Sequence, residues 1–201
     1  AILCNRMGID IWEVIDAAKT KPYGFQPFYP GPGLGGHCIP LDPYYLSWKA
    51  REYGFHTSMI ETSMMVNDRM PEYTVERAGK ILNRDKKSLN GSKVLVLGAA
   101  YKQDIDDYRE SPAVRVMEEF RKTGALVDYY DPYVPKYRDA GVWYEGIPAL
   151  TPEAVKGYDL VCITTAHTNV DYAMVTGCGV PVFDCKNVCK GIENRENIEV
   201  L

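Results

Sequence analysis

The part of the chain after residue 90 alternates short apolar runs with signals for helix starts, and this alternation restricts the folds open to it. KVLVLG at 93–98 is a continuous apolar run with valine at alternate positions, which is typical of a strand buried on both faces of a sheet. Runs of the same kind follow at 125–131, 158–164 and 180–185, and Ser-Pro or Thr-Pro pairs between them predict helix N-termini. Because parallel strands need helical crossovers, this order predicts an α/β fold with a parallel sheet.

The part of the chain before residue 90 predicts helices. Two helices are indicated there: one over 42–53, which Gly54 ends, and one over 58–87, where apolar side chains recur at helical spacing. Asp42 followed by Pro43 is a typical N-cap and first-turn pair, so we expect the first of these helices to begin there. The second pattern is long enough to connect two parts of a protein, and Pro71 should kink or divide it.

We therefore predict two units: a helical central region at residues 1–88 that ends in the long connecting helix, and a doubly wound parallel-sheet domain at residues 89–201. The net charge of −4 gives no overall attraction to nucleic acid, and no apolar run reaches the length of a membrane span. The chain has six cysteines without a CxxC pair. In a chain of this size, that pattern favours free thiols in a reducing cytoplasm over a disulfide framework.

Before the first of these helices lies GPGLGGHCIPLD at 31–42, a loop with four glycines, two prolines and one cysteine. Glycine permits positive φ and close backbone approach, whereas proline fixes φ and removes a donor. Such a segment either packs tightly for structural reasons or lets a ligand come close to the thiol of Cys38. A thiolate is a strong nucleophile, while a buried cysteine is often only a small apolar side chain, so both interpretations stay open at this point.

The first strand of the α/β unit is followed by GAAYKQDIDD, not by the GxGxxG of a dinucleotide-binding turn. Open α/β sheets still bind ligands at the carboxyl ends of their strands, and Lys102 lies there, although a lone lysine is also an ordinary surface charge. The acidic residues after it lack the ligand spacing of an EF-hand, and we expect them to pair with Arg109 instead of binding calcium. Cys185 and Cys189 lack the second half of a metal site, so we predict no metal centre.

Three segments resemble, in the same order, the nucleotide-diphosphate-sugar 6-dehydrogenases of the UDP-glucose/GDP-mannose dehydrogenase family: GPGLGGHCIPLDP at 31–43, VNDRMP at 66–71 and VLGAAYKQDIDDYRESPA at 96–113. DCKN at 184–187 is similar to a further family segment. The resemblance covers essentially the whole chain and implies the family's central portion followed by its Rossmann-like UDP-binding domain. The chain opens with ILCNRMG, which reads as the end of a helix, so we expect it to be part of a longer protein.

His37 after two glycines and Leu41 before Asp42 are similar to the UDP-N-acetylhexosamine branch, whereas the UDP-glucose branch usually has a lysine before the aspartate. The resemblance therefore implies an NAD-dependent UDP-N-acetylhexosamine 6-dehydrogenase, which oxidises the sugar C6 alcohol to a carboxylate. Its cofactor NAD would be bound mainly by a domain absent from this chain, and the helix at 58–88 would form a homodimer. We take His37 as a marker of the branch without a catalytic role, because consecutive side chains of an extended segment point apart.

Within that reaction, the resemblance implies that Cys38 adds to the C6 aldehyde and passes through a thiohemiacetal and a thioester. Asp42 would assist proton transfer or position the hydrolytic water, or else cap the helix that begins there. Lys186 stands where relatives often have arginine, so it would keep the charge and lose the bidentate contact. Gly33, Gly35 and Gly36 would let the main chain run against the sugar. The substrate-binding residues implied by the motifs are Phe28, Tyr29, Gly33, Gly35, Gly36, Tyr101, Lys102, Arg109 and Lys186.

Three other functions are consistent with the sequence. The missing GxGxxG fingerprint also fits a nucleotide-sugar-binding module without catalysis, and the family includes UDP-glucose 6-dehydrogenases. A cysteine hydrolase or acyltransferase would use Cys38 with His56 or His167, which requires an imidazole within hydrogen-bond distance of the thiol.

Overall fold

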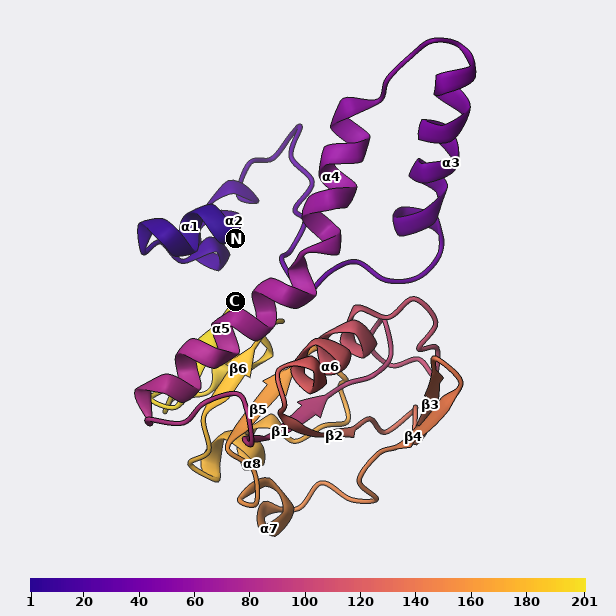
Figure 1. Cartoon of the computed structure of the whole chain (residues 1–201). Helices are drawn as coiled ribbons and strands as arrows, with labels where there is room; N and C mark the ends of the chain where they lie inside the picture. Colours follow the sequence, from indigo (N-terminus) through magenta and orange to yellow (C-terminus); the bar gives the residue numbers. More distant parts are fainter.

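A computed structural model describes residues 1–201 as an α/β layer from which a pair of helices, α3 and α4, projects (Figure 1). The helical part consists of α1 (Ile2–Met7), α2 (Ile11–Ala18), α3 (Cys38–Glu52), α4 (Ser58–Asp68) and α5 (Met70–Arg84). The α/β part consists of β1 (Lys93–Leu97), α6 (Pro112–Lys122), β2 (Leu126–Tyr130), β3 (Lys136–Asp139), β4 (Val142–Glu145), α7 (Pro152–Val155), β5 (Leu160–Ile163), α8 (Tyr172–Gly177), β6 (Val182–Asp184), the 3-10 turn η1 (Val188–Gly191) and β7 (Ile198–Val200). None of these helices has both the length and the apolar character that a membrane crossing requires.

The main sheet has five strands in the order β2-β1-β5-β6-β7, and every neighbouring pair is parallel. This confirms the predicted α/β class and the four predicted strands, which became β1, β2, β5 and β6. Helix α8, the edge strand β7 and the antiparallel hairpin of β3 and β4 were not predicted from the sequence. All three missed elements are short, and the hairpin strands carry charged residues in place of the apolar runs that marked the predicted strands.

Helices cover both faces of the sheet, as its apolar strands require. On one face α5 and α6 pack, and Ala78 and Phe120 join alternate residues of β1 in one apolar core. On the other face Val155 of α7 and Val175 of α8 pack in a second core. Helix α5, which the sequence analysis assigned to the helical region, thus packs on the sheet, and the domain boundary at residue 88 stays a prediction.

The long helical pattern is divided near Pro71, as predicted. Helix α4 ends at Asp68 and α5 begins at Met70, with Pro71 in the first turn of α5, where its missing N–H removes no helical bond. In Figure 1, α4 runs away from the sheet beside α3, whereas α5 crosses the layer. The two halves of the predicted connecting helix therefore have different neighbours.

The predicted start of the next helix was wrong, because α3 begins at Cys38 and not at Asp42. Pro40 occupies one of the first three helical positions, whose N–H groups have no partner within any helix, and Pro43 removes only the bond to the Ile39 carbonyl. The two prolines therefore allow the earlier start. Asp42 lies inside the helix and does not cap it, and it stands one turn after Cys38 on the same face.

Candidate functional site

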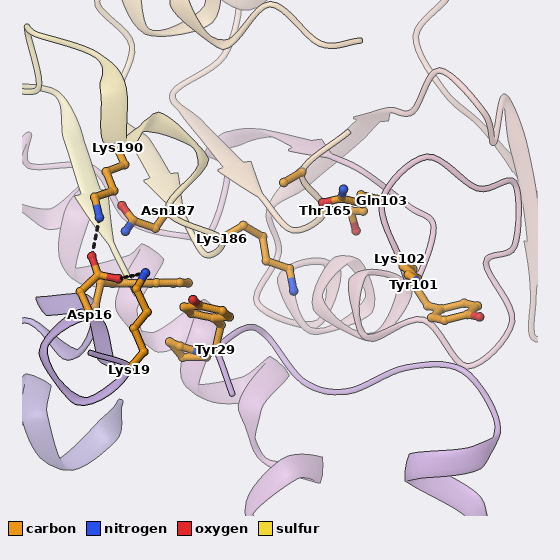
Figure 2. A pocket seen from close by; sticks show the side chains of 13 residues that line it. Asp16, Lys19, Tyr29, Tyr101, Lys102, Gln103, Thr165, Lys186, Asn187 and Lys190 are labelled. Carbon is orange, nitrogen blue, oxygen red and sulfur yellow. Dashed lines mark hydrogen bonds and ion pairs between the residues drawn. The ribbon is translucent and has the colours of Figure 1, made fainter. Parts of the chain in front are cut away.

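A cleft of about 540 Å³ lies at the carboxyl ends of β1, β5 and β6 (Figure 2). Its walls come from α2, from residues 29–30, and from the loops that follow the three strands, at 101–103, 165–166 and 186–190. Ligands of open α/β sheets bind at this end of the strands. The cleft is where the sequence analysis placed Lys102, and the structure adds the wall formed by α2, which no sequence signal indicated.

The cleft has an excess of positive charge. Lys19, Lys102, Lys186 and Lys190 line it, against a single carboxylate, that of Asp16. Asp16 accepts hydrogen bonds from Lys19, at 2.6 Å, and from Lys190, and these bonds, the one from Lys19 foremost, lower the pKa of Asp16 to about 2. They join α2 to the segment after β6. Neither Lys102 nor Lys186 forms an ion pair, so both charges are available to an anionic ligand.

Lys186 is the more buried of these two lysines. Its burial lowers the pKa of the ammonium group, because desolvation disfavours the charged form. The Nζ atom lies against Gly31, where an added Cβ would be only 2.9 Å away. Figure 2 shows the side chain extended into the space between Tyr29 and Tyr101. A partly desolvated ammonium group without a carboxylate partner is well suited to bind a phosphate.

Two stacked aromatic rings, Trp12 of α2 and Tyr29, form one wall of the cleft. Tyr29 stacks on Trp12, with ring centres 5.8 Å apart and an angle of 16° between the planes. The indole Nε1 of Trp12 is buried without a hydrogen-bond partner, so this wall contains a donor that the protein leaves unsatisfied. Phe28, which the sequence analysis placed in the sugar pocket with Tyr29, is 76% exposed and does not line the cleft. Neighbouring side chains of an extended segment point to opposite sides.

The glycine-rich segment leaves the cleft and packs on the α/β unit. An added Cβ at Gly35 would lie 2.6 Å from Tyr101 Cβ and 2.8 Å from the backbone oxygen of Glu110, and one at Gly36 would lie 2.9 Å from the Tyr101 ring. Gly33 in addition has a φ of 132°, which few other residues adopt. The main chain at these glycines therefore runs against protein. Their contact with the sugar stays a prediction.

The segment then enters α3, whose first residue is the exposed Cys38. Nitrogen, sulfur and oxygen atoms of His37, Cys38 and Asp42 lie within 4.8 Å of one another, and His37 Nδ1 is 3.5 Å from Asp42 Oδ1. The extended conformation assumed for His37 and Cys38 was wrong, because α3 begins at Cys38. The imidazole lies beside Asp42 and forms no hydrogen bond with the thiol, and the role of His37 as a branch marker stays a prediction. Cys38 does not line the cleft but is connected to it by the glycine segment, which Figure 2 shows passing from Tyr29 beyond Tyr101.

The structure does not bring Arg109 to the cleft. Its guanidinium group donates hydrogen bonds to both carboxylate oxygens of Asp107, at 2.9 and 2.8 Å, which confirms the predicted pairing within the acidic loop. Arg109 lines a different cleft, together with Arg115 and Arg138. Its role in substrate binding stays a prediction.

The two histidines of the hydrolase hypothesis are engaged elsewhere. His56 Nε2 lies 3.5 Å from a carboxylate oxygen of Glu61. His167 Nε2 lies 3.0 Å from Asp131, and its Nδ1 accepts a hydrogen bond from the backbone N–H of Asp104. Neither imidazole forms the pair with the thiol that this hypothesis requires.

The loop after β1 does not form a dinucleotide site. A Cβ added to Gly98, the first residue of the loop, would lie 2.4 Å from Thr165 Cβ, so this glycine serves packing between two loops. The next helix, α6, begins only at Pro112, so no helix N-terminus follows β1 directly, where a pyrophosphate would bind. The residues present here do not fit NAD in the manner of a GxGxxG turn.

Two sequence profiles of one family match the chain. The profile described as "UDP-glucose/GDP-mannose dehydrogenase family, central domain" matches residues 1–69, and the one described as the family's "UDP binding domain" matches residues 95–191. UDP-N-acetyl-D-glucosamine 6-dehydrogenase of Pseudomonas aeruginosa is 38% identical over 168 residues, which is 84% of this chain and 39% of that protein. UDP-N-acetyl-D-mannosamine dehydrogenase of Methanocaldococcus jannaschii is 33% identical, and the match covers 97% of this chain and 40% of that protein.

Solved structures agree with these matches. UDP-D-ManNAc dehydrogenase from Pyrococcus horikoshii superposes with a TM-score of 0.82 at 28% identity, over 99% of this chain and 45% of that one. An NDP-N-acetyl-D-galactosaminuronic acid dehydrogenase from Methanosarcina mazei also gives 0.82, at 27% identity, over 100% of this chain and 45% of that one. The chain thus spans less than half the length of these relatives. With both domain profiles in order and the same fold throughout, the chain belongs to the UDP-glucose/GDP-mannose dehydrogenase family.

Proposed function

We propose that this chain binds a UDP-N-acetylhexosamine and supplies the thiol of an NAD-dependent 6-dehydrogenase, which oxidises the C6 alcohol of the sugar to a carboxylate. One observation carries the proposal. Lys102 and Lys186 lack carboxylate partners in a cleft that a continuous glycine segment connects to the exposed Cys38. The names of the relatives support an acetamido sugar, and Leu41 supports the same branch.

The cleft suits a nucleoside diphosphate. Lys102 and Lys186 would contact the phosphates, because both are cationic and without an ion-pair partner. The base would lie against Tyr29, whose ring is already backed by a tryptophan. The sugar would then extend along the glycine segment past Tyr101, toward Cys38.

In the chemistry that we propose, the sulfur of Cys38 adds to the C6 aldehyde produced by the first oxidation, and this covalent bond keeps the aldehyde from escaping. The second oxidation leaves a thioester. The carboxylate of Asp42, within 4.8 Å of the sulfur, would position the water that hydrolyses it and take up a proton. NAD supplies a hydride acceptor when bound, and we propose that a domain outside residues 1–201 holds most of it.

Cys38→Ser tests the thiol in the protein that joins this chain to an NAD-binding domain. We expect acid formation to be lost while calorimetry still detects UDP-sugar binding, because a serine hydroxyl is a far weaker nucleophile. Cys178→Ser is the matched control, since that partly exposed thiol bonds only to backbone carbonyls of Met174 and Pro152. Acid formation that survives Cys38→Ser would refute the assignment.

Ligand binding separates the enzyme from a non-catalytic binding module and tests the division of labour. We expect residues 1–201 to bind UDP but to bind NAD hardly at all, and tight NAD binding would contradict the domain assignment. In the protein with its NAD-binding domain, NADH formation should occur with UDP-GlcNAc or UDP-ManNAc and be slower with UDP-glucose. UDP binding without NADH formation from any of the three sugars would favour the binding module.

We also propose that two copies of the chain associate through α3 and α4. Large apolar side chains are exposed on and around this pair: Tyr45, Leu46, Trp48, Tyr53, Phe55, Met59 and Met65. Such surfaces are typical of interfaces between copies. The interface predicted at 58–88 stays a prediction; because one face of α5 packs on the sheet, we centre the proposed interface on α3 and α4.

Sedimentation velocity with Trp48→Glu tests this interface. A charge placed on the apolar surface should give a monomer, because a buried unpaired carboxylate is costly. Trp143→Glu is the matched control, since Trp143 is an exposed tryptophan of β4, far from the helical pair in the fold (Figure 1). A dimer that persists in Trp48→Glu, or a wild-type monomer, would contradict the proposal.

A further inference from the structure

A buried histidine–aspartate pair lies beside the loop that carries Lys102, and the proposed function does not use it. His167 is 1% exposed, the carboxylate of Asp131 is fully buried, and the two are joined by a contact of 3.0 Å between Nε2 and Oδ2. Asp131 follows β2 and His167 follows β5, which are the two neighbours of β1 in the sheet. The pair therefore spans the carboxyl end of β1, where the Lys102 loop begins.

The pair holds this loop both before and after Lys102. The Oδ2 atom of Asp131 accepts hydrogen bonds from the backbone N–H groups of Ala99, at 2.7 Å, and Ala100, at 2.9 Å. On the far side, His167 Nδ1 accepts one from the N–H of Asp104, at 3.0 Å. Backbone of residues 99–104 is thus fixed at both ends by one buried pair, with Lys102 between the two attachments.

These contacts define the protonation state of the imidazole. Because His167 Nδ1 accepts from a backbone N–H, it carries no proton, so Nε2 carries it and donates to Asp131. The other oxygen of Asp131 accepts from the N–H groups of Tyr133 and Val134. Only the neutral imidazole, protonated on Nε2, satisfies this network.

The surroundings of His167 show what a second proton would do. Tyr133 lies beside the ring, with centres 5.1 Å apart, and the Tyr172 hydroxyl donates to the His167 carbonyl. The charged neighbours are two carboxylates: Asp131, and Asp104, whose Oδ1 is 3.8 Å from Nδ1. A proton on Nδ1 removes the acceptor of the Asp104 N–H and attracts the Asp104 carboxylate.

That carboxylate is already in use, because it accepts hydrogen bonds from the N–H and the hydroxyl of Thr168. Protonation of His167 would therefore exchange one set of contacts at Asp104 for another and loosen the far end of the Lys102 loop. We propose that His167, together with Asp131, is a positioning residue that holds Lys102 for a phosphate of the nucleotide sugar, and that it does so only as a neutral imidazole. This inference rests on the proposed role of Lys102 in ligand binding.

Calorimetry with UDP-N-acetylglucosamine tests the inference on residues 1–201. Each phosphate of this ligand carries one ester and one anhydride bond, so neither has an ionisation near neutral pH. At pH 7.5, His167→Gln should weaken binding about five- to twentyfold. At an acidic pH where NMR shows the wild-type ring to be protonated, the ratio of variant to wild-type Kd should fall toward one, because the wild type then loses the same contacts. His56→Gln is the matched control, an exposed histidine far from this loop in the chain, and its Kd should equal that of the wild type at both pH values.

A double-mutant cycle separates positioning from general support of the fold. If His167 acts through Lys102, then His167→Gln should add little to the loss caused by Lys102→Met. Additive losses, or a His167→Gln variant that folds and binds like the wild type, would overturn the positioning role. If the wild-type chain does not bind the ligand at all, the proposed function fails and the positioning role fails with it.

Nitrogen NMR of wild-type His167 gives a readout that does not depend on any variant or ligand. We expect the Nε2–H tautomer at neutral pH, and a shift of the Asp104 amide proton that follows protonation of the ring on acidification. An Nδ1–H tautomer, or an Asp104 amide that ignores this titration, would overturn the inference even if His167→Gln does not fold.

Discussion

Gly35→Ala tests whether the glycine segment is closed onto the α/β unit. Gly35 does not have a positive φ, so alanine meets no backbone strain there, and the cost arises from space alone. The added Cβ would lie 2.6 Å from Tyr101 Cβ, 2.7 Å from Pro112 Cδ and 2.8 Å from the backbone oxygen of Glu110. None of these atoms is the end of a flexible side chain. Overpacking typically costs about 1–3 kcal/mol, and three simultaneous overlaps place Gly35→Ala at about 2–3 kcal/mol.

Thermal unfolding and calorimetry measure the effect. For a chain of this length, about 2–3 kcal/mol lowers the midpoint by about 4–12 °C. If the segment opens locally instead, the midpoint is kept and binding of UDP, which makes no proposed contact with the segment, weakens about tenfold for every 1.4 kcal/mol by which closure is destabilised. Gly177→Ala is the matched control, because its φ is also ordinary and no atom lies within 4 Å of its added Cβ. A Gly35→Ala variant that equals this control in both midpoint and affinity would refute the packing argument.

Three further predictions concern charges. Arg77→Met and Arg84→Met each remove a partner of Glu199; Arg77 is 5% exposed, whereas the side chain of Arg84 is 68% exposed. In urea unfolding we expect the free energy of unfolding to fall by about 3 kcal/mol for the buried arginine and by about 0–1 kcal/mol for the exposed one. Equal losses would contradict the burial argument. Burial opposes ionisation of Asp131, but hydrogen bonds from a histidine and from backbone N–H groups hold its pKa below the ordinary value. A lowered folded pKa stabilises the fold above the unfolded pKa, and this contribution is lost as pH falls through the folded pKa. Asp131→Asn should therefore lower the free energy of unfolding most at neutral pH. In urea unfolding, the difference in this free energy between variant and wild type should shrink below about pH 4. A difference that does not change with pH would contradict the prediction. Burial lowers the pKa of Lys186 and a bound diphosphate should raise it again, so UDP binding at alkaline pH should take up protons. Calorimetry in buffers of different ionisation enthalpy measures this uptake, which should disappear in Lys186→Met.

Three of the four strands that the sequence predicted correctly, β1, β5 and β6, are buried on both faces, whereas β2 is a partly exposed edge strand. Their valine and leucine runs reflect burial, which is a local property of the sequence as well as of the fold. The hairpin at 136–145 and the edge strand at 198–200 carry no such run. Their strand conformation depends on pairing with distant or oppositely running segments, and spacing within one window does not reveal it. The start of α3 was missed for another reason, because Pro43 was taken as a first-turn residue although a helix tolerates it in its second turn at the loss of one bond.

The candidate site also contains some residues that the sequence could reveal and others that only the fold reveals. Cys38, Lys102 and Lys186 lie in motifs and could be named from the sequence. Trp12 and Asp16 lie on an ordinary amphipathic helix, and only the packing of α2 beside the cleft gives them a role. The polar residue that ends the apolar run at 125–131 was a readable signal for Asp131, since side chains at the carboxyl ends of parallel strands meet at one edge of the sheet.

The cleft is bounded by two joints between the helical region and the α/β unit. At one end, glycine backbone packs on Tyr101, and at the other, Asp16 of α2 accepts a hydrogen bond from Lys190. The two lysines without partners lie between the joints, so a bound diphosphate would add a third attachment at the same boundary. Closure of the glycine segment onto the α/β unit and ligand binding are then coupled, because the ligand binds the closed state and thereby stabilises it. Gly35 makes no proposed contact with UDP itself, so Gly35→Ala must weaken UDP binding only if closure matters. Lys102→Met does not test closure, because it removes a direct contact with the ligand.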